Sequence, residues 1–170
     1  ETQPDLSRFS EELTPVVLPE LSQLSASIQG QIQGQYDRVV RLRESDGDSV
    51  AALSEAHGEL GMILMAANLD ATATDAFLHA HAQDPDELRW PYYLAQLLRE
   101  NGDTEGAIEF YRRALQLDPG YLAAQVWLGE VYLDASRPED AETSFRQALE
   151  ADPSSVAALS GMGRAALAAG

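Results

Sequence analysis

The sequence lacks cysteine and lysine altogether and has only three histidines. Without cysteine, the chain has no disulfide bridge, thiolate metal site or cysteine nucleophile. Of the histidines, His57, His79 and His81, the last two are two residues apart and would point away from each other on a helix, which makes them a poor metal site. The sequence therefore predicts no metal and no cofactor.

Long apolar runs are missing as well. No stretch of about 18 apolar residues could span a bilayer, and no basic segment followed by an apolar one reads as a signal peptide. Because the chain starts at Glu1 rather than at a methionine, an export signal could have been removed. We expect no membrane span, and we favour a periplasmic or secreted location over a cytoplasmic one.

Positive charge is scarce: 28 acidic residues stand against 11 arginines, which gives a net charge of −17. A chain without a basic patch disfavours phosphate backbones and anionic lipid surfaces, so nucleic acid is not an expected partner. The acidic surplus can also serve solubility alone, as in a protein from a salt-adapted or GC-rich source. With 45% hydrophobic residues, the chain can bury a core as one domain.

A period of 34 residues runs through the rest of the chain. Pro85, Pro119 and Pro153 mark it, and small and aromatic residues precede each proline in the same register. The recurring sets are Ala73, Phe77, Ala80; Ala107, Tyr111, Ala114; Ala141, Phe145, Ala148; and, in the first half of each unit, Leu60-Gly61-Leu64, Leu94-Ala95-Leu98, Leu128-Gly129-Tyr132 and Met162-Gly163-Ala166.

These spaced residues resemble the tetratricopeptide repeat, whose pattern is Leu-Gly-x-x-Tyr, then Ala-x-x-x-Phe, then Ala and Pro. The resemblance covers residues 54–170, as repeats 54–87, 88–121 and 122–155 and a partial repeat 156–170. It implies an all-α fold, a right-handed α-solenoid of stacked antiparallel helix pairs with an extended concave surface.

Small residues at one repeat position should let the first helix of each pair approach its partner closely; they are Gly61, Ala95, Gly129 and Gly163. Between the helices of a pair, Gly102 and Gly170 suit a left-handed turn, Asn68 is a tolerable substitute, and Ser136 departs from the pattern.

Residues 1–53 do not continue the period. Apolar residues at intervals of three and four predict a long amphipathic helix from about residue 20 to 44, within a capping segment 20–53 that covers the first repeat. Asp48 or Ser49 can cap the following helix, which should run to residue 67. Residues 1–19, with three prolines, read as an extended tail.

The stretch Trp90-Pro91-Tyr92 raises a separate question. Because Pro91 suits only a first helical turn, the helix should begin at about Trp90 or Pro91. Trp90 then either folds back into the core or lies partly on the inner surface.

The resemblance also implies which residues face the concave groove, at a helical stripe spaced by three and four. Methionine, other apolar residues and arginine in this stripe suit a peptide or helix with apolar anchors and a carboxylate. The same residues could instead form an unused inner face or pack on the next repeat. The candidate partner-binding residues are Met62, Met65, Arg89, Tyr92, Gln96, Arg99, Val126, Glu130, Leu133 and Arg164.

Catalytic motifs are absent from the sequence: it has no glycine-rich phosphate loop and no nucleophile motif, and its carboxylates gather at helix starts, where they stabilise the helix dipole. We expect a non-catalytic protein-interaction module that acts as a scaffold or adaptor. The alternatives are a structural module that associates with itself through the apolar C-terminal helix or the tail, and a recognition arm of a larger enzyme or secretion assembly.

Overall fold

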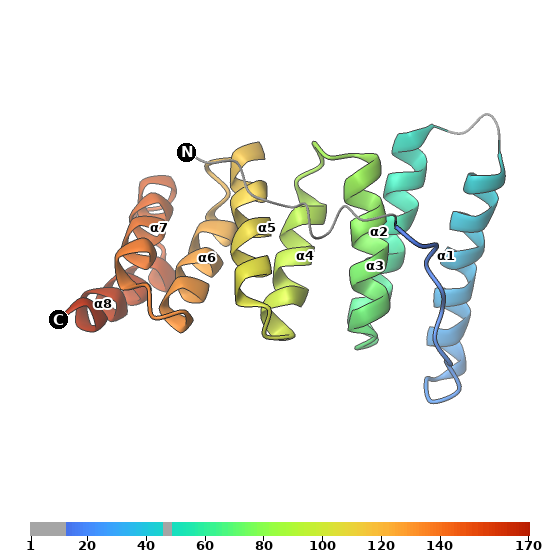
Figure 1. Cartoon of the computed structure of the whole chain (residues 1–170), viewed down its shortest axis with the longest axis horizontal. Coiled ribbons are helices and arrows are strands. Elements are labelled where there is room, and N and C mark those ends of the chain that lie inside the picture. Colours follow the sequence, from blue (N-terminus) through green and yellow to red (C-terminus); the bar gives the residue numbers. More distant parts are fainter. Residues whose placement is uncertain (1–12, 46–48) are drawn as a thin grey trace. The chain divides into compact units, whose positions relative to one another are not determined.

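A computed structural model describes residues 13–45 and 49–170 of the chain. These residues form eight α-helices and no strand (Figure 1). The helices are α1 Ala26–Glu44, α2 Val50–Ala66, α3 Asp70–Gln83, α4 Arg89–Glu100, α5 Thr104–Leu117, α6 Leu122–Asp134, α7 Pro138–Ala151 and α8 Val156–Ala169. The fold is an all-α solenoid of paired helices, as the period predicted.

The described residues divide into two compact units whose boundary falls between Trp90 and Pro91, near the start of α4. In the N-terminal unit, residues 13–90, α2 packs against α1 and α3. In the C-terminal unit, residues 91–170, α6 packs against α5, α7 and α8, and α7 also packs against α8. We call α2, α4, α6 and α8 the first helices of the repeats, and α3, α5 and α7 the second helices.

Two of the predicted close approaches are present, and one is not. A Cβ on Gly61 would lie 2.8 Å from Phe77, and a Cβ on Gly129 would lie 2.6 Å from Phe145. Gly163 has open space around it, so its close approach to a second helix stays a prediction. Its repeat position faces the second helix of a pair, and no second helix follows α8 among the described residues.

The turns within the repeats follow the predicted geometry, including the one with the unusual residue. Asn68 and Ser136 both have φ of 57°, in the left-handed region, and Gly102 has φ of 79°. Ser136 is therefore held in a backbone conformation that a residue with a Cβ rarely adopts.

The N-terminal helix is shorter than predicted. Leu21 and Leu24, which had been counted in its apolar stripe, instead close a turn through a hydrogen bond from the amide of Leu24 to the carbonyl of Leu21 (2.9 Å). Ser25 then caps α1 by accepting from the amide of Ile28. The next helix starts as predicted, because Ser49 accepts from the amide of Ala52 at 3.1 Å; Asp48 lies outside the described residues.

The described part of the tail, residues 13–19, has no helix or strand and packs on the N-terminal unit. The Tyr36 hydroxyl on α1 donates to the carbonyl of Val16 (3.2 Å), and His79 Nε2 on α3 lies 2.8 Å from the carbonyl of Thr14. Val16 is buried as a result. Residues 1–12 lie outside the described part of the chain.

Trp90 belongs to the core. It is fully buried, its Nε1 donates to Ser54 Oγ at 3.0 Å, and Ser54 Oγ donates in turn to the carbonyl of Ala80 at 2.9 Å. The indole ring occupies the space that a Cβ on Gly58 would need, with a nearest approach of 2.1 Å. Of the two readings of this tryptophan, the structure shows the fold-back into the core.

Candidate functional site

The candidate residues of the N-terminal unit lie on α2 and at the start of α4. Met62 and Met65 are half-buried on α2. Arg89 makes two hydrogen bonds to the carboxylate of Glu55, at 2.7 and 3.2 Å, and an ion pair with Glu87 at 3.0 Å. The hydrogen bonds to Glu87 and Glu55 raise the pKa of Arg89 above its ordinary value, so the charge of Arg89 is already matched inside the chain.

The candidate residues of the C-terminal unit lie on the first helices α4, α6 and α8. Arg164 of α8 forms an ion pair with Glu130 of α6, which raises the pKa of Arg164. Val126 and Leu133 are half-buried on α6 and share its face with Glu130, because they are spaced by four and three residues. We call the surface formed by these helices the first-helix face.

A cluster of aromatic and polar side chains lies at one end of this face. Gln96 Nε2 donates to the Tyr92 hydroxyl at 2.9 Å, and Arg99 Nη2 donates to Gln96 Oε1 at 3.4 Å, which links three residues of α4. The guanidinium of Arg99 stacks on Trp127 of α6, 4.4 Å from the ring centre, and the rings of Tyr92 and Tyr121 meet edge to face at 5.1 Å. We call these five residues the Arg99 cluster.

Arg99 differs from the other two candidate arginines in its partners. Its Nε is buried and has no hydrogen-bond acceptor within the described residues. Among the described residues, its ion pair is with Glu100, the next residue on the same helix, at 3.3 Å. The side chain is about a quarter exposed, so its guanidinium is fixed in direction by Trp127 and Gln96 while it remains in reach of solvent.

Trp127 and Tyr121 were missed by the sequence reasoning. Counted from the first residue of each repeat (54, 88, 122 and 156), the groove stripe comprises positions 2, 5, 9 and 12, whereas Trp127 occupies position 6. A signal was nevertheless present, because position 6 holds residues as different as Glu59, Tyr93 and Gly161 in the other repeats. A tryptophan at a position that has no common packing role in the repeats indicates a contact that is particular to its own repeat.

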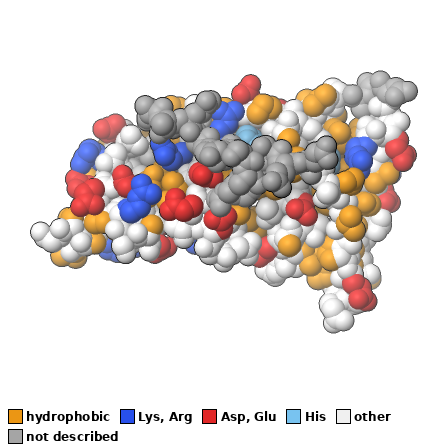
Figure 2. Space-filling model, viewed as in Figure 1, with side chains coloured by type: hydrophobic (Ala, Val, Ile, Leu, Met, Phe, Trp, Pro, Cys, Tyr) orange, Lys and Arg blue, Asp and Glu red, His pale blue; other side chains and the backbone are white. Residues whose placement is uncertain are grey.

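On the face of the molecule shown in Figure 2, acidic and arginine side chains are intermingled over much of the C-terminal unit. Within residues 13–45 and 49–170, no group of three or more histidine, aspartate or glutamate side chains could hold a metal ion. His79 stacks on His57, with ring centres 4.9 Å apart. Among the helices that the structure describes, none has the length and apolar character needed to cross a membrane.

Comparison with known families supports the repeat assignment. Two tetratricopeptide repeat models match the sequence, one at residues 98–143 and one at residues 128–170. None of the curated proteins compared with the sequence matches it.

Solved structures of similar fold include several repeat domains. A tetratricopeptide repeat protein from Parabacteroides merdae superposes with a TM-score of 0.70 at 21% identity, over 85% of this chain and 61% of that one. The first repeat domain of Spaghetti, bound to the HSP90 peptide SRMEEVD, gives 0.66 at 19% identity, over 72% and 95%. The Sgt2 domain from Aspergillus fumigatus gives 0.61 at 23%, over 67% and 77%. At these identities the likeness shows the fold.

Proposed function

Since this chain is a tetratricopeptide repeat protein, we propose that it is a protein-interaction module whose first-helix face, in the C-terminal unit, binds a segment of a partner protein. The segment is an extended or helical peptide with apolar side chains and a carboxylate. In this role the chain acts as a non-catalytic scaffold or adaptor.

The observation that carries the proposal is the Arg99 cluster. Glu55 already matches the charge of Arg89, and Glu130 that of Arg164. Arg99 is held in one direction by Trp127 and Gln96, and within the described residues its Nε has no acceptor of ordinary geometry, although the Tyr111 hydroxyl lies close to the guanidinium. A positioned guanidinium beside aromatic rings is suited to bind a carboxylate, because little side-chain freedom is lost on binding.

Apolar contacts come from the same face. Val126 and Leu133 are half-buried on α6 and keep part of their surface for a ligand. Tyr92, at the edge of the Arg99 cluster, presents a ring and a hydroxyl together, a combination common in the centres of protein interfaces. The N-terminal unit, taken by itself, offers two adaptable apolar side chains, Met62 and Met65.

The acidic HSP90 peptide bound by the Spaghetti domain supports a ligand of this kind, but not the same ligand. The carboxylate clamp typical of such peptide sites uses lysine and asparagine at inner positions. This chain has no lysine, and the corresponding positions of its first repeat are Gly58 and Met62. Gly58, moreover, is covered by Trp90. We expect recognition of a carboxylate by the Arg99 cluster instead.

The test is a quantitative pull-down from an extract of the source organism, followed by calorimetry with the captured partner or its binding segment. Arg99→Ala and Tyr92→Ala are compared with the wild type, and Arg146→Ala serves as control, since Arg146 is an exposed arginine on α7 that pairs with Glu142. Circular dichroism verifies the fold of each variant.

We expect Arg99→Ala to weaken binding by about 2 kcal/mol or more, roughly 30-fold, as for a residue at the centre of an interface. Arg146→Ala should leave the affinity unchanged. Equal affinities of folded Arg99→Ala, folded Tyr92→Ala and the wild type would refute binding at this face.

A further inference from the structure

A groove in the C-terminal unit lies between the second helices α5 and α7, with the first helix α6 at its floor. Its volume is about 620 Å³, within the usual range of ligand sites. Gln125, Leu128 and Tyr132 of α6 are buried in the floor, and Arg112 and Arg137 are half-buried in the walls. We call it the α5/α7 groove. None of its lining residues belongs to the candidate residues of the first-helix face or to the Arg99 cluster.

A small side chain leaves space on the α7 side of the groove. Ser144 of α7 is buried, and its Oγ donates to the carbonyl of Asp140 at 3.2 Å. Phe110 holds the same repeat position on α5, 34 residues earlier, and is buried as well. A ring the size of that of Phe110 would take up the space that Ser144 leaves. The third repeat therefore has a polar hollow at a position where the second repeat has a packed ring.

The floor of the groove contains a hydrogen-bond acceptor that the chain does not use. Gln125 is 4% exposed, and its Oε1 has no hydrogen-bond partner within the described residues. Its Nε2 donates to the carbonyl of Pro119 at 3.3 Å. Because this bond is long, the carboxamide can turn to bring its oxygen toward a ligand. Buried acceptors without a partner are uncommon in folded proteins, so Gln125 indicates a donor from outside the chain.

Arg112 supplies a positive charge that no acid of the described chain matches. It makes no hydrogen bond or ion pair with another described residue. Arg137 in the other wall, by contrast, pairs with Asp140 at 2.7 Å and stacks on the ring of Tyr132, 4.6 Å from the ring centre. In a chain with 28 acidic residues and 11 arginines, an unmatched arginine beside a groove is suited to bind an external anion.

The hydroxyl of Tyr132 adds a donor at the same place. It makes no hydrogen bond with another residue that the structure describes. Burial raises the pKa of Tyr132, and the positive charges of Arg112 and Arg137 oppose that shift. Both guanidinium groups therefore lie near enough to act on the hydroxyl, which stays protonated at neutral pH and can donate to an anion together with Arg112.

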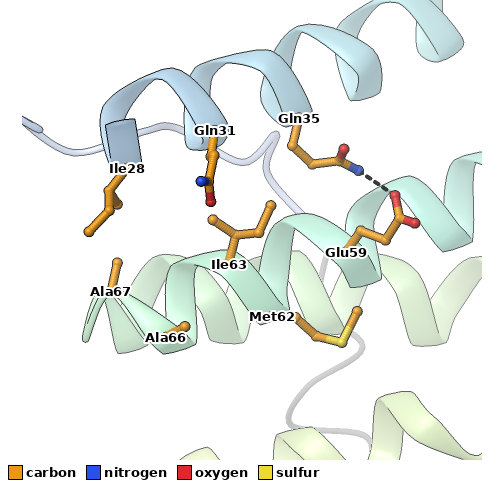
Figure 3. A pocket seen from close by; sticks show the side chains of 8 residues that line it. All are labelled: Ile28, Gln31, Gln35, Glu59, Met62, Ile63, Ala66 and Ala67. Carbon is orange, nitrogen blue, oxygen red and sulfur yellow. Dashed lines mark hydrogen bonds between the residues drawn. The ribbon is translucent and has the colours of Figure 1, made fainter. Parts of the chain in front are cut away.

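A pocket in the N-terminal unit, between α1 and α2, differs in how its charge is matched (Figure 3). Its charged residue Glu59 accepts a hydrogen bond from Gln35 at 2.9 Å, the dashed line of Figure 3, and is paired with Arg38. That pocket leaves no charge of its lining without a partner in the chain. The α5/α7 groove leaves Arg112 unmatched, and this difference favours the α5/α7 groove as a ligand site.

We propose that the α5/α7 groove binds an acidic segment of a polypeptide, as a second site apart from the first-helix face. One carboxylate of the segment accepts hydrogen bonds from Arg112 and Tyr132, and an adjacent backbone N–H donates to the carboxamide oxygen of Gln125. The charges favour one carboxylate over a doubly charged phosphate, because Asp140 already matches Arg137 and a single positive charge remains.

The rim of the groove favours a peptide over an enclosed small molecule. Sites for small molecules are mostly apolar and bury most of the ligand. Here the floor carries polar side chains and the rim is open to solvent, so a segment of extended chain can lie across it. The exposed residues of the rim are Gln116, Pro119, Thr143 and Gln147.

The test is a titration of the isotope-labelled chain, followed by nuclear magnetic resonance, with two capped alanine pentapeptides. One peptide has a central glutamate, and the other has a central glutamine in its place. The side-chain N–H signals of Arg112 and Gln125 report on the groove, and the indole N–H of Trp127 reports on the Arg99 cluster. The two sites are therefore followed separately in one experiment.

Two variants remove the proposed contacts, and a third serves as control. Arg112→Gln removes the unmatched charge, and Gln125→Leu removes the unpaired acceptor. Arg146→Gln is the matched control, because Arg146 holds the repeat position of Arg112 in the third repeat, is exposed, and pairs with Glu142. In each variant the groove residue that remains provides the signal, and urea unfolding checks the fold.

We expect the glutamate peptide to shift the signals of Arg112 and Gln125, and the glutamine peptide to bind at least ~10-fold more weakly. Arg112→Gln should weaken binding of the glutamate peptide by a similar factor, and Arg146→Gln should leave it unchanged. Gln125→Leu should also weaken binding without lowering the urea midpoint, because the variant loses an acceptor that is unpaired in the folded chain. This combination separates a binding role of Gln125 from a structural one.

Three results would overturn the proposal. In the first, the glutamate peptide at up to about 10 mM shifts neither groove signal. In the second, it shifts the indole signal of Trp127 alone, which would support binding at the first-helix face and exclude the groove. In the third, folded Arg112→Gln binds the glutamate peptide as tightly as the wild type does.

Discussion

The hydroxyl of Tyr111 offers a sharp test of the described core. The residue lies on α5, is fully buried, and its oxygen has no hydrogen-bond partner of ordinary geometry within the part of the chain that the structure describes, although the Arg99 guanidinium lies close to it. Burial raises the pKa of Tyr111, against the opposing effects of the positive charge of Arg99 and, to a lesser extent, of hydrogen bonding from its guanidinium. The equivalent residues of the neighbouring repeats are Phe77 and Phe145, so the surrounding space accepts a phenylalanine.

Replacing Tyr111 by phenylalanine removes one oxygen and leaves the ring. A buried polar group without a partner costs about 1–3 kcal/mol. We expect Tyr111→Phe to raise the free energy of unfolding by about 1 kcal/mol, the lower end of that range, since Arg99 is close enough to compensate in part. For a chain of this size, that corresponds to a rise of about 2–4 °C in Tm.

The assay is urea unfolding followed by circular dichroism, with Tyr36→Phe as the matched control. The Tyr36 hydroxyl donates to the carbonyl of Val16 at 3.2 Å, so its loss should lower the free energy of unfolding by about 0.5–1.5 kcal/mol. The two substitutions are chemically identical and should have opposite signs. If Tyr111→Phe is as destabilising as Tyr36→Phe, the buried hydroxyl has a partner and the reasoning is wrong.

Three further predictions concern the backbone and pH. Ser136→Gly should raise the free energy of unfolding by about 0.5–1 kcal/mol, because glycine adopts the left-handed turn without strain; a lower urea midpoint would contradict this. Gly58→Ala should be destabilising by about 1–3 kcal/mol, since the new methyl overlaps the ring of Trp90, whereas Gly30→Ala, with open space around it, should stabilise α1 by up to about 1 kcal/mol; equal effects in thermal unfolding would count against the packing described. Burial lowers the pKa of His57 to about 4; the unfolded chain therefore binds a proton near its ordinary pKa of 6.5 while the folded chain does not, and stability should fall by about 2–3 kcal/mol as pH drops from 6.5 toward 4. Subtracting the pH profile of His57→Gln isolates this effect, and identical profiles would exclude it.

Most of the fold followed from the sequence because it depends on local signals. The prolines and the alanine–aromatic register predict the helix pairs, and Asn68 and Gly102 predict left-handed turns, which the structure has. The start of α1 did not follow, because Leu21 and Leu24 fit an apolar helical stripe although they belong to a turn. Periodicity alone cannot separate the two.

The candidate site was less predictable because it depends on how far side chains reach between repeats. The stripe rule included Tyr92, Gln96 and Arg99 and omitted Trp127, whose ring carries the guanidinium of Arg99. The same rule did not predict that Arg89 forms an ion pair with Glu55, an acid of the preceding repeat. Spacing within one helix gives the direction of a side chain, but pairing between helices also depends on length and rotamer.

The ion pairs between repeats have a consequence for how such a chain can be rearranged. Glu55 and Arg89 are separated by 34 residues and so are Glu130 and Arg164, one pair at the second repeat position and the other at the ninth. Neither pair uses the residues that define the repeat pattern. If the second or third repeat were deleted, or the two were exchanged, the chain would keep its helix pairs but place at least one of these charges opposite a neutral residue; if either repeat were duplicated, two like charges would face each other. The repeats are alike in shape and yet ordered by charge, so they are not interchangeable modules.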